Sequence, residues 1–201
     1  MMPEASVLMV SGDPVGVEIE LLAGRLRCPG CDDRLAPWGQ ARGRNVRSMG
    51  GVERRVQPRR ARCVGCARTH VLLPEVLLVR RRDEVEVIGG ALVAHAAGGG
   101  HRRIAERLGV PAATVRGWLR RFRLRASAIA AFFTQWALTL APGSDPPVPA
   151  GSALGDAVEA VGVATRAAVR RFGPRAVWAL AGRLTGGGLL ANTSCLWLAP
   201  V

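Results

Sequence analysis

Four of the five cysteines occur as two C-x-x-C pairs. The first pair is Cys28 and Cys31, in the run CPGC, and the second is Cys63 and Cys66, in the run CVGC. A tight C-x-x-C turn presents two thiolates to one point, and two such turns complete the tetrahedron of sulfur ligands that suits Zn²⁺. The sequence therefore predicts a structural zinc site with these four cysteines as its ligands.

Two other uses of the paired thiols stay open, a redox dithiol and unliganded thiols in a core. A thioredoxin-like redox site needs a βαβ context, and no such pattern surrounds either pair. The 31 residues between the pairs exceed the roughly 15–20 that are usual for such zinc sites. Gly and Pro divide them into short runs, as in a zinc ribbon, with strands expected over residues 34–38, 44–47, 52–56 and 59–62.

Expectations for three further residues follow from their positions relative to the predicted zinc site. His70 follows the second pair closely, and we expect it in the core or beside a ligand, because four cysteines already fill a structural site. Trp38 is expected to pack against the cysteine turns. Cys195 stands alone in an apolar tail, which favours a buried free thiol.

The charge of the chain is strongly positive and unevenly distributed. All 28 basic residues are Arg, against 15 acidic residues, and the formal net charge is +13. Residues 25–125 alone hold 23 Arg and 8 acids, which is 23 − 8 = +15. Such a concentration indicates a polyanionic partner, and the guanidinium fork suits phosphate and guanine edges.

The centre of the basic region, residues 100–122, has the pattern of two short helices joined by a tight turn. Ile104 and Leu108 lie on one face of the first helix. Gly109 suits a left-handed turn, and Pro111 suits the first position of a second helix. The apolar residues of that second helix, at helical spacing, are Val115, Trp118 and Leu119. This is the pattern of a helix-turn-helix whose second helix enters the major groove of DNA, and an ordinary helical hairpin is the alternative.

The inward positions of the second helix determine which residues face outward. The expected groove-facing residues are Ala112, Ala113, Arg116, Gly117 and Arg120, and the expected phosphate contacts are Arg102, Arg103, Thr114 and Arg121. Arg116 is the best candidate for a bidentate contact to guanine. A second group of candidate phosphate contacts lies between the cysteine pairs and comprises Arg44, Arg54, Arg55, Arg59 and Arg60.

The remaining segments complete an α+β chain. Residues 1–24 alternate in polarity, which predicts one strand over residues 15–21 in a partly disordered segment, and residues 25–73 form the ribbon. In residues 74–141, Asp83 and Glu86 resemble a capping box, and the second helix of the pair is expected to continue to residue 141. Residues 142–152 read as a linker, and residues 153–201 as a helical segment of unknown role.

The apolar run from residue 126 to residue 141 needs a partner surface. It is shorter than the ~20 residues of a membrane span, so we expect Phe132, Phe133 and Trp136 to bury against residues 153–201 or against a second copy in a homodimer. The N-terminus lacks the basic start of a signal peptide. These observations predict a cytoplasmic protein, with double-stranded DNA as partner and with neither a membrane nor a small-molecule substrate.

The order of the motifs CPGC, CVGCARTHVLLP, RRRDEVEVIGGAL and GHRRIAERLGVPAATVRGWLRRF resembles a family of bacterial proteins that pair a zinc ribbon with a helix-turn-helix. It is also similar to the N-terminal DNA-binding region of insertion-sequence transposases. The resemblance covers roughly residues 25–125. It implies a transposase-like DNA-binding module in which the four paired cysteines bind zinc.

The chain departs from a transposase on the C-terminal side of the helix pair. Transposases hold two metal ions with carboxylates of a large catalytic domain. Here the only acids after the helix pair are Asp145, Asp156 and Glu159, within about sixty residues. We therefore expect a non-catalytic DNA-binding protein, a regulator or a shortened transposase relative. Two alternatives stay open: a DNA-binding subunit that acts with a catalytic partner, and a protein-interaction module.

Overall fold

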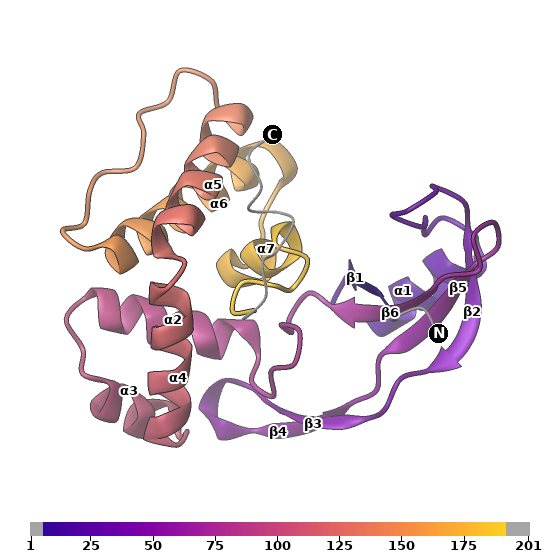
Figure 1. The fold of residues 1–201 in the computed structure, drawn as a ribbon, viewed down its shortest axis with the longest axis horizontal. Coiled ribbons are helices and arrows are strands. Elements are labelled where there is room, and N and C mark those ends of the chain that lie inside the picture. Colours follow the sequence, from indigo (N-terminus) through magenta and orange to yellow (C-terminus); the bar gives the residue numbers. More distant parts are fainter. Residues whose placement is uncertain (1–5, 192–201) are drawn as a thin grey trace.

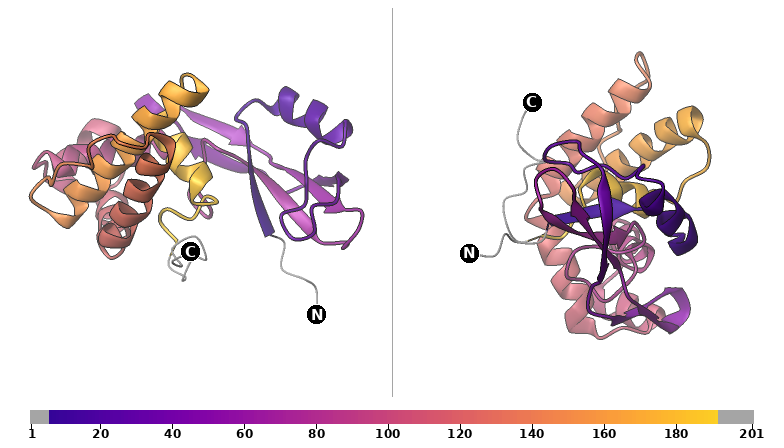
Figure 2. Two further views of the ribbon diagram at one scale, coloured as in Figure 1. Left: turned by 90° about the horizontal axis from the view of Figure 1, so that it is seen from above. Right: turned by 90° about the vertical axis from the view of Figure 1, so that its right-hand side faces the viewer.

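The computed structural model describes residues 6–191 and places an N-terminal β-sheet beside an array of helices (Figure 1). The view from above shows the sheet and helix α1 at one side of the molecule and the other helices at the opposite side (Figure 2). The expected α+β class, with the sheet first and the helices after it, is confirmed.

The sheet has four strands in the order β1-β6-β5-β2. Their bounds are β1 Ser6–Val10, β6 Thr69–Pro74, β5 Arg59–Cys63 and β2 Leu35–Gln40. β1 runs parallel to β6, and the other neighbours are antiparallel. The two inner strands bury small and apolar side chains such as Ala61 and Leu72. The runs between the cysteine pairs are therefore strands, as expected, whereas β1 and β6 were not predicted.

A two-stranded hairpin extends from this sheet to the helices (Figure 1). It consists of β3 (Arg44–Arg47) and β4 (Glu53–Val56), with the short helix η1 (Met49–Gly51) at its tip. Strands β2 and β5 continue directly into the hairpin. A hydrogen bond from Ala41 N–H to Pro58 O, at 2.8 Å, joins the two connections. This hairpin thus accounts for the residues by which the spacing between the cysteine pairs exceeds the usual one.

The prediction of a strand over residues 15–21 is wrong. These residues form helix α1 (Pro14–Leu22), because the Asp13 carboxylate caps its first turn and accepts hydrogen bonds from the N–H groups of Val15 and Gly16 at 3.0 Å each. Val17 and Leu21, four residues apart, are the buried side chains of the helix. The strand of this segment lies earlier, at β1, in a stretch that was expected to be partly disordered.

The helical part contains α2 (Val85–Ala96), α3 (His101–Leu108), α4 (Ala112–Arg123), α5 (Ala126–Leu140), α6 (Ala153–Phe172) and α7 (Val177–Leu184). One hydrophobic core joins them, and its largest fully buried side chains include Phe122 and Phe133. Phe133 is 1% exposed and shares this core with Leu154 and Ala157 of α6. The expected burial of Phe133 against residues 153–201 is confirmed.

The expected continuation of one helix from α4 to residue 141 is wrong. α4 ends at Arg123, Arg125 leaves the helical conformation at φ −124° and ψ 5°, and α5 begins at Ala126. Leu124, at the turn, is 77% exposed. The turn lets α5 pack along α6, so that Phe122 and Phe133 both reach the common core.

The expected capping box at the start of α2 does not form. Asp83 is buried and lies 3.3 Å from an Nη atom of Arg47, and the N-cap position is held by Glu84 without a side-chain hydrogen bond. Glu86 instead accepts hydrogen bonds from the N–H groups of Trp178 and Ala179, at 3.0 and 3.2 Å. It therefore caps the first turn of α7, a helix more than 90 residues away in the sequence.

Candidate functional site

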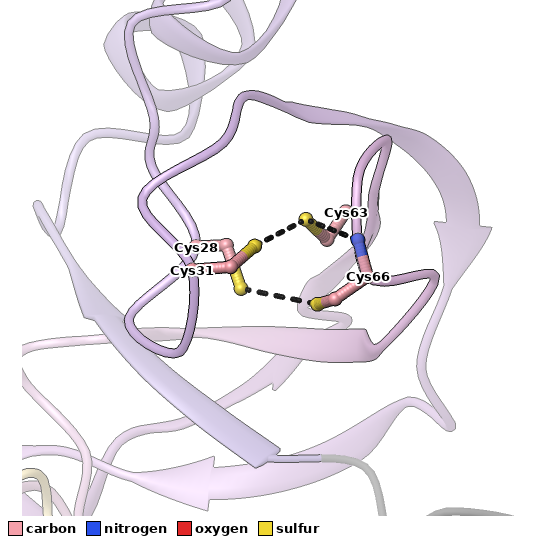
Figure 3. A group of neighbouring side chains, drawn as sticks. All are labelled: Cys28, Cys31, Cys63 and Cys66. Atoms are coloured by element: carbon pink, nitrogen blue, oxygen red, sulfur yellow. Dashed lines mark hydrogen bonds between the residues drawn. The ribbon is translucent and has the colours of Figure 1, made fainter.

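The four paired cysteines meet at one point of the sheet half (Figure 3). Their Sγ atoms all lie within 4.8 Å of one another, with 3.3 Å between Cys31 and Cys63 and 3.7 Å between Cys28 and Cys66. Cys28 and Cys63 are buried, and Cys31 and Cys66 are exposed. The predicted clustering of these residues is confirmed.

The two cysteine turns have the same backbone geometry. The N–H of the residue after the second cysteine donates to the carbonyl of the first cysteine, at 2.9 Å for Asp32 and 3.1 Å for Ala67. These two residues also share a left-handed backbone, with φ of 58° and 59°. In the second turn a Cβ at Gly65 would press against the Asp33 side chain, which would have to move aside. Two matching turns of this kind are the arrangement that closes a four-thiolate metal site.

The distances and the chemistry of the four sulfurs suit a metal ion of tetrahedral preference. With Zn–S bonds of about 2.3 Å, the ligand sulfurs of a tetrahedron lie about 3.8 Å apart. The four Sγ atoms here approach that separation. The cluster can therefore hold a metal ion, and its donor set of thiolates is compatible with zinc.

The thiols of the cluster differ in acidity. The pKa of Cys63 is lowered to about 7, first by the backbone N–H of Cys66, which favours its thiolate. The pKa of Cys31 is raised to about 12, because sharing of protons with Cys63 and Cys66 outweighs the backbone N–H of Asp33, which lowers it. Because the four sulfur atoms lie close together, deprotonation of all four thiols costs free energy unless a cation takes the place of the protons.

Two residues were predicted beside this cluster, and the structure places them differently. His70 is 1% exposed, with Nε2 3.5 Å from Cys28 Sγ and Nδ1 2.6 Å from Ser6 Oγ. It is a buried neighbour of a cysteine, as expected. Trp38 is half exposed and carries the Arg62 guanidinium 4.7 Å above its ring, so the prediction that it packs against the turns is wrong. Cys195 lies outside the described residues.

The second candidate site is the exposed face of α3 and α4. Gly109 joins these helices in the left-handed conformation, at φ 64°, and Val110 and Val115 are buried. Pro111 holds the N-cap position of α4, one residue before the position expected for it. The geometry of two short helices with a tight turn is thus present.

The residues predicted to face DNA lie mostly on the surface. Arg102 and Arg103 of α3 are exposed, and the exposed residues of α4 include Ala113, Arg116 and Arg120. Ala112 packs partly against the core and takes less part in the outer face. A guanidinium N–H of Arg121 donates to Gly117 O at 3.0 Å, which holds this arginine along α4.

Two hollows flank this face of α4. One, of about 460 Å³, is lined by Ala113, Arg116, Gly117, Arg120 and Arg121. The other, of about 380 Å³, lies between α4 and the preceding turn of residues 80–83, and the arginines that line it are Arg47, Arg80, Arg81, Arg82 and Arg121. The run Arg80–Arg82 was not among the predicted contacts, although three consecutive arginines in the sequence are a visible signal.

The arginines between the cysteine pairs do not form one free strip. Arg54 pairs with Glu84 at 2.6 Å, and Arg59 pairs with Glu18 at 2.7 Å. Arg44 is partly buried, and burial lowers its pKa. Arg60 is also partly buried, and Arg55 is exposed. Among the predicted ribbon contacts Arg55 is therefore best placed to meet an anion.

Comparison with known proteins gives one finding. Residues 28–118 match the family described as "Domain of unknown function (DUF6431)". The match begins at the first paired cysteine and ends in α4, so it spans the four-cysteine cluster and the α3–α4 pair together. No curated protein and no solved structure matches the chain. None of the described helices has the length and apolar character that crossing a membrane requires.

Proposed function

We propose that the protein is a non-catalytic double-stranded DNA-binding protein that docks α4 in the major groove and holds a structural Zn²⁺ with its four paired cysteines. The observation that carries the proposal is the composition of the outer face of α4. Arginines and small residues alternate along this face, and two hollows border it. The role is that of a regulator or of a transposase relative.

The composition of this face supports docking in a groove. Ala113 and Gly117 have little or no side chain, so the helix backbone can approach the bases closely. Arg116 is exposed between them and is the candidate for a bidentate contact to the O6 and N7 atoms of guanine. Arg102 and Arg103, on the first helix of the pair, are placed to contact phosphates.

The proposed metal would stabilise the sheet half rather than take part in a reaction. The core around the cysteines has eight buried residues, and two of them are Cys28 and Cys63 themselves. A unit of this size depends on its metal for much of its stability. Four protein ligands also leave no open position for a substrate.

Two of the three acids that follow the helix pair have structural contacts, which supports the non-catalytic part of the proposal. Asp156 accepts a hydrogen bond from Ala150 N–H at 2.6 Å, ahead of α6. Glu159 pairs with Arg166 at 2.9 Å. Asp145 is exposed in the connection between α5 and α6.

Binding-site selection followed by salt titration tests the proposal. The wild type should bind duplex DNA with an affinity that falls steeply with salt. Arg116→Ala should cost about 1–3 kcal/mol at the preferred site and remove the preference at one position, whereas Arg103→Ala should weaken all duplexes alike and lower the salt slope by about one. Arg170→Ala, an exposed arginine of α6, is the matched control. Full sequence preference in Arg116→Ala, or duplex binding that does not respond to salt, would refute the proposal.

A further inference from the structure

The hollow of about 380 Å³ between α4 and residues 80–83 has an unusual charge balance. Five arginines line it, and Asp83 is the only acid among its lining residues. Asp83 is already committed, because it is buried and lies 3.3 Å from Arg47. Its single negative charge, attracted by both Arg47 and Arg82, offsets one of the five positive charges, so the hollow keeps a net positive charge.

Arg81 shows the effect of this crowding. One of its guanidinium N–H groups donates to Leu190 O at 2.7 Å, while its buried Nε atom has no hydrogen-bond partner within residues 6–191. Its pKa is lowered by burial and, further, by the charge of Arg121. An anion in the hollow would offset the repulsion between Arg81 and Arg121.

The position of the hollow relates it to the face of α4. The second hollow, which Arg116 and Arg120 also line, lies on the neighbouring side of α4. The two hollows share three lining residues: Ala113, Gly117 and Arg121. α4 thus forms a ridge with a basic depression along one flank. A helix that lies in the major groove has a phosphate backbone along each flank.

We propose that this hollow binds a backbone phosphate of the DNA on which α4 docks, with Arg80 and Arg82 contacting the phosphate from the turn and Thr114 from the helix. The inference rests on the proposed function and adds a contact from outside the helix pair. Thr114 contributes a hydroxyl to the lining, and Arg80 and Arg82 are exposed. Charge-assisted contacts of this kind give affinity and fix the register of the helix on the duplex.

The β3–β4 hairpin holds this turn in place. Arg47 N–H donates to Arg82 O at 2.8 Å, and Glu84 N–H donates to Arg47 O at 2.9 Å. Arg54 of β4 also pairs with Glu84. The sheet half therefore positions the phosphate site through its hairpin, even where its own arginines are engaged in ion pairs.

The test compares the double variant Arg80→Asn, Arg82→Gln with the control Arg170→Gln, Arg171→Gln, which removes the same charge from exposed positions of α6. Arg80 has a left-handed backbone, at φ 59°, which asparagine tolerates. Salt titration of duplex binding should show a slope reduced by about one to two and a loss of about 10-fold or more at 0.1 M salt in the hollow variant. The control should change the slope much less.

Ethylation interference locates the contact on the DNA. Ethylation of one or two phosphates on a single flank of the site should impair wild-type binding and should have no effect on the hollow variant. The single variant Arg82→Gln leaves Arg80, with its left-handed backbone, unchanged, and should show half the slope change. It therefore tests the site even if the double variant misfolds. If the hollow variants match the control in slope and interference pattern while Arg116→Ala loses sequence preference, the phosphate site is wrong and the proposed function stands. If the wild type fails to bind duplex DNA, both are wrong.

Discussion

Substitution of one buried and one exposed cysteine separates a metal site from a core of packed thiols. Cys63 is 2% exposed, whereas Cys66 is exposed. If the thiols are only packed, Cys63→Ser places an unsatisfied hydroxyl in the core and costs about 1–3 kcal/mol. Cys66→Ser is then a surface change within about 0.5 kcal/mol of neutral. If exposure alone decides the loss of stability, Cys63→Ser should be clearly more destabilising than Cys66→Ser.

A shared metal predicts a different result. Structural zinc in small domains contributes about 10–16 kcal/mol at neutral pH, and each of four ligands accounts for about a quarter of that, roughly 2.5–4 kcal/mol. Cys63→Ser and Cys66→Ser should therefore destabilise the sheet half to a similar extent. Both should also lower the zinc content below the one ion per chain expected for the wild type.

Metal analysis of the purified protein and urea unfolding followed by circular dichroism measure the two quantities. Val64→Ser, at a half-exposed position of the same turn, is the matched control and should keep both zinc and stability. A neutral Cys66→Ser beside a destabilised Cys63→Ser, with no metal in the wild type, would refute the metal site. Addition of a strong chelator should destabilise the wild type by more than either substitution does, because it removes the whole contribution of the metal, and it should bring the wild type and both cysteine variants close to the same stability.

Three further predictions concern the helical half and can be read from unfolding curves. Phe133→Ala should cost about 3–5 kcal/mol because the side chain is fully buried, and Phe132→Ala, at the partly buried neighbouring position, should cost clearly less; equal losses would contradict the assigned face of α5. Glu86→Gln keeps the size of the side chain but weakens the cap of α7, and should cost about 1–2 kcal/mol, with an unchanged melting curve counting against it. Gly89→Ala should destabilise the protein because its Cβ would collide with the Trp178 indole, and Trp178→Leu in the same chain should recover part of the loss if that collision is the cause.

The features that the sequence predicted well are those determined by neighbouring residues. The cysteine turns and the α3–α4 turn each depend on a few consecutive residues, and the left-handed backbone at Gly109 is an example of such a local requirement. The strands between the cysteine pairs were also predicted from a local signal, the Gly and Pro residues that divide the segment into short runs. For the same reason the clustering of the four cysteines followed directly from their spacing.

The errors have two physical origins. At α1 the alternation of apolar residues suggested a strand, while Asp13 and Pro14 carried the stronger signal of a helix start. At the end of α4, Phe122, Ala126 and Ile129 keep helical spacing across the break, so periodicity could not reveal it.

Partners distant in the sequence lie beyond any local pattern. The pairing of β1 with β6 joins residues more than sixty positions apart. The ion pair of Arg59 with Glu18 and the cap that Glu86 provides to α7 also join residues from separate parts of the sequence. Ion pairs such as that of Arg59 with Glu18 decide which arginines are free to meet an anion, which is why the predicted strip between the cysteines was only partly available.

The hairpin between the cysteine turns has a consequence for how such proteins diversify. Its stem is closed at the base, where Gln40 pairs with Arg59, before β3 and β4 begin. Insertions or deletions beyond that base would leave the four sulfurs undisturbed, because both turns lie on the other side of it. The tip, with Gly50 and Gly51 in left-handed conformations and exposed Met49 and Val52, lies against α3, so a change in its length or sequence would alter that contact without moving the sulfurs. Exchanging hairpins between related chains would alter the reach beside α4 while retaining one metal-binding scaffold, which makes this segment a natural graft point for engineering.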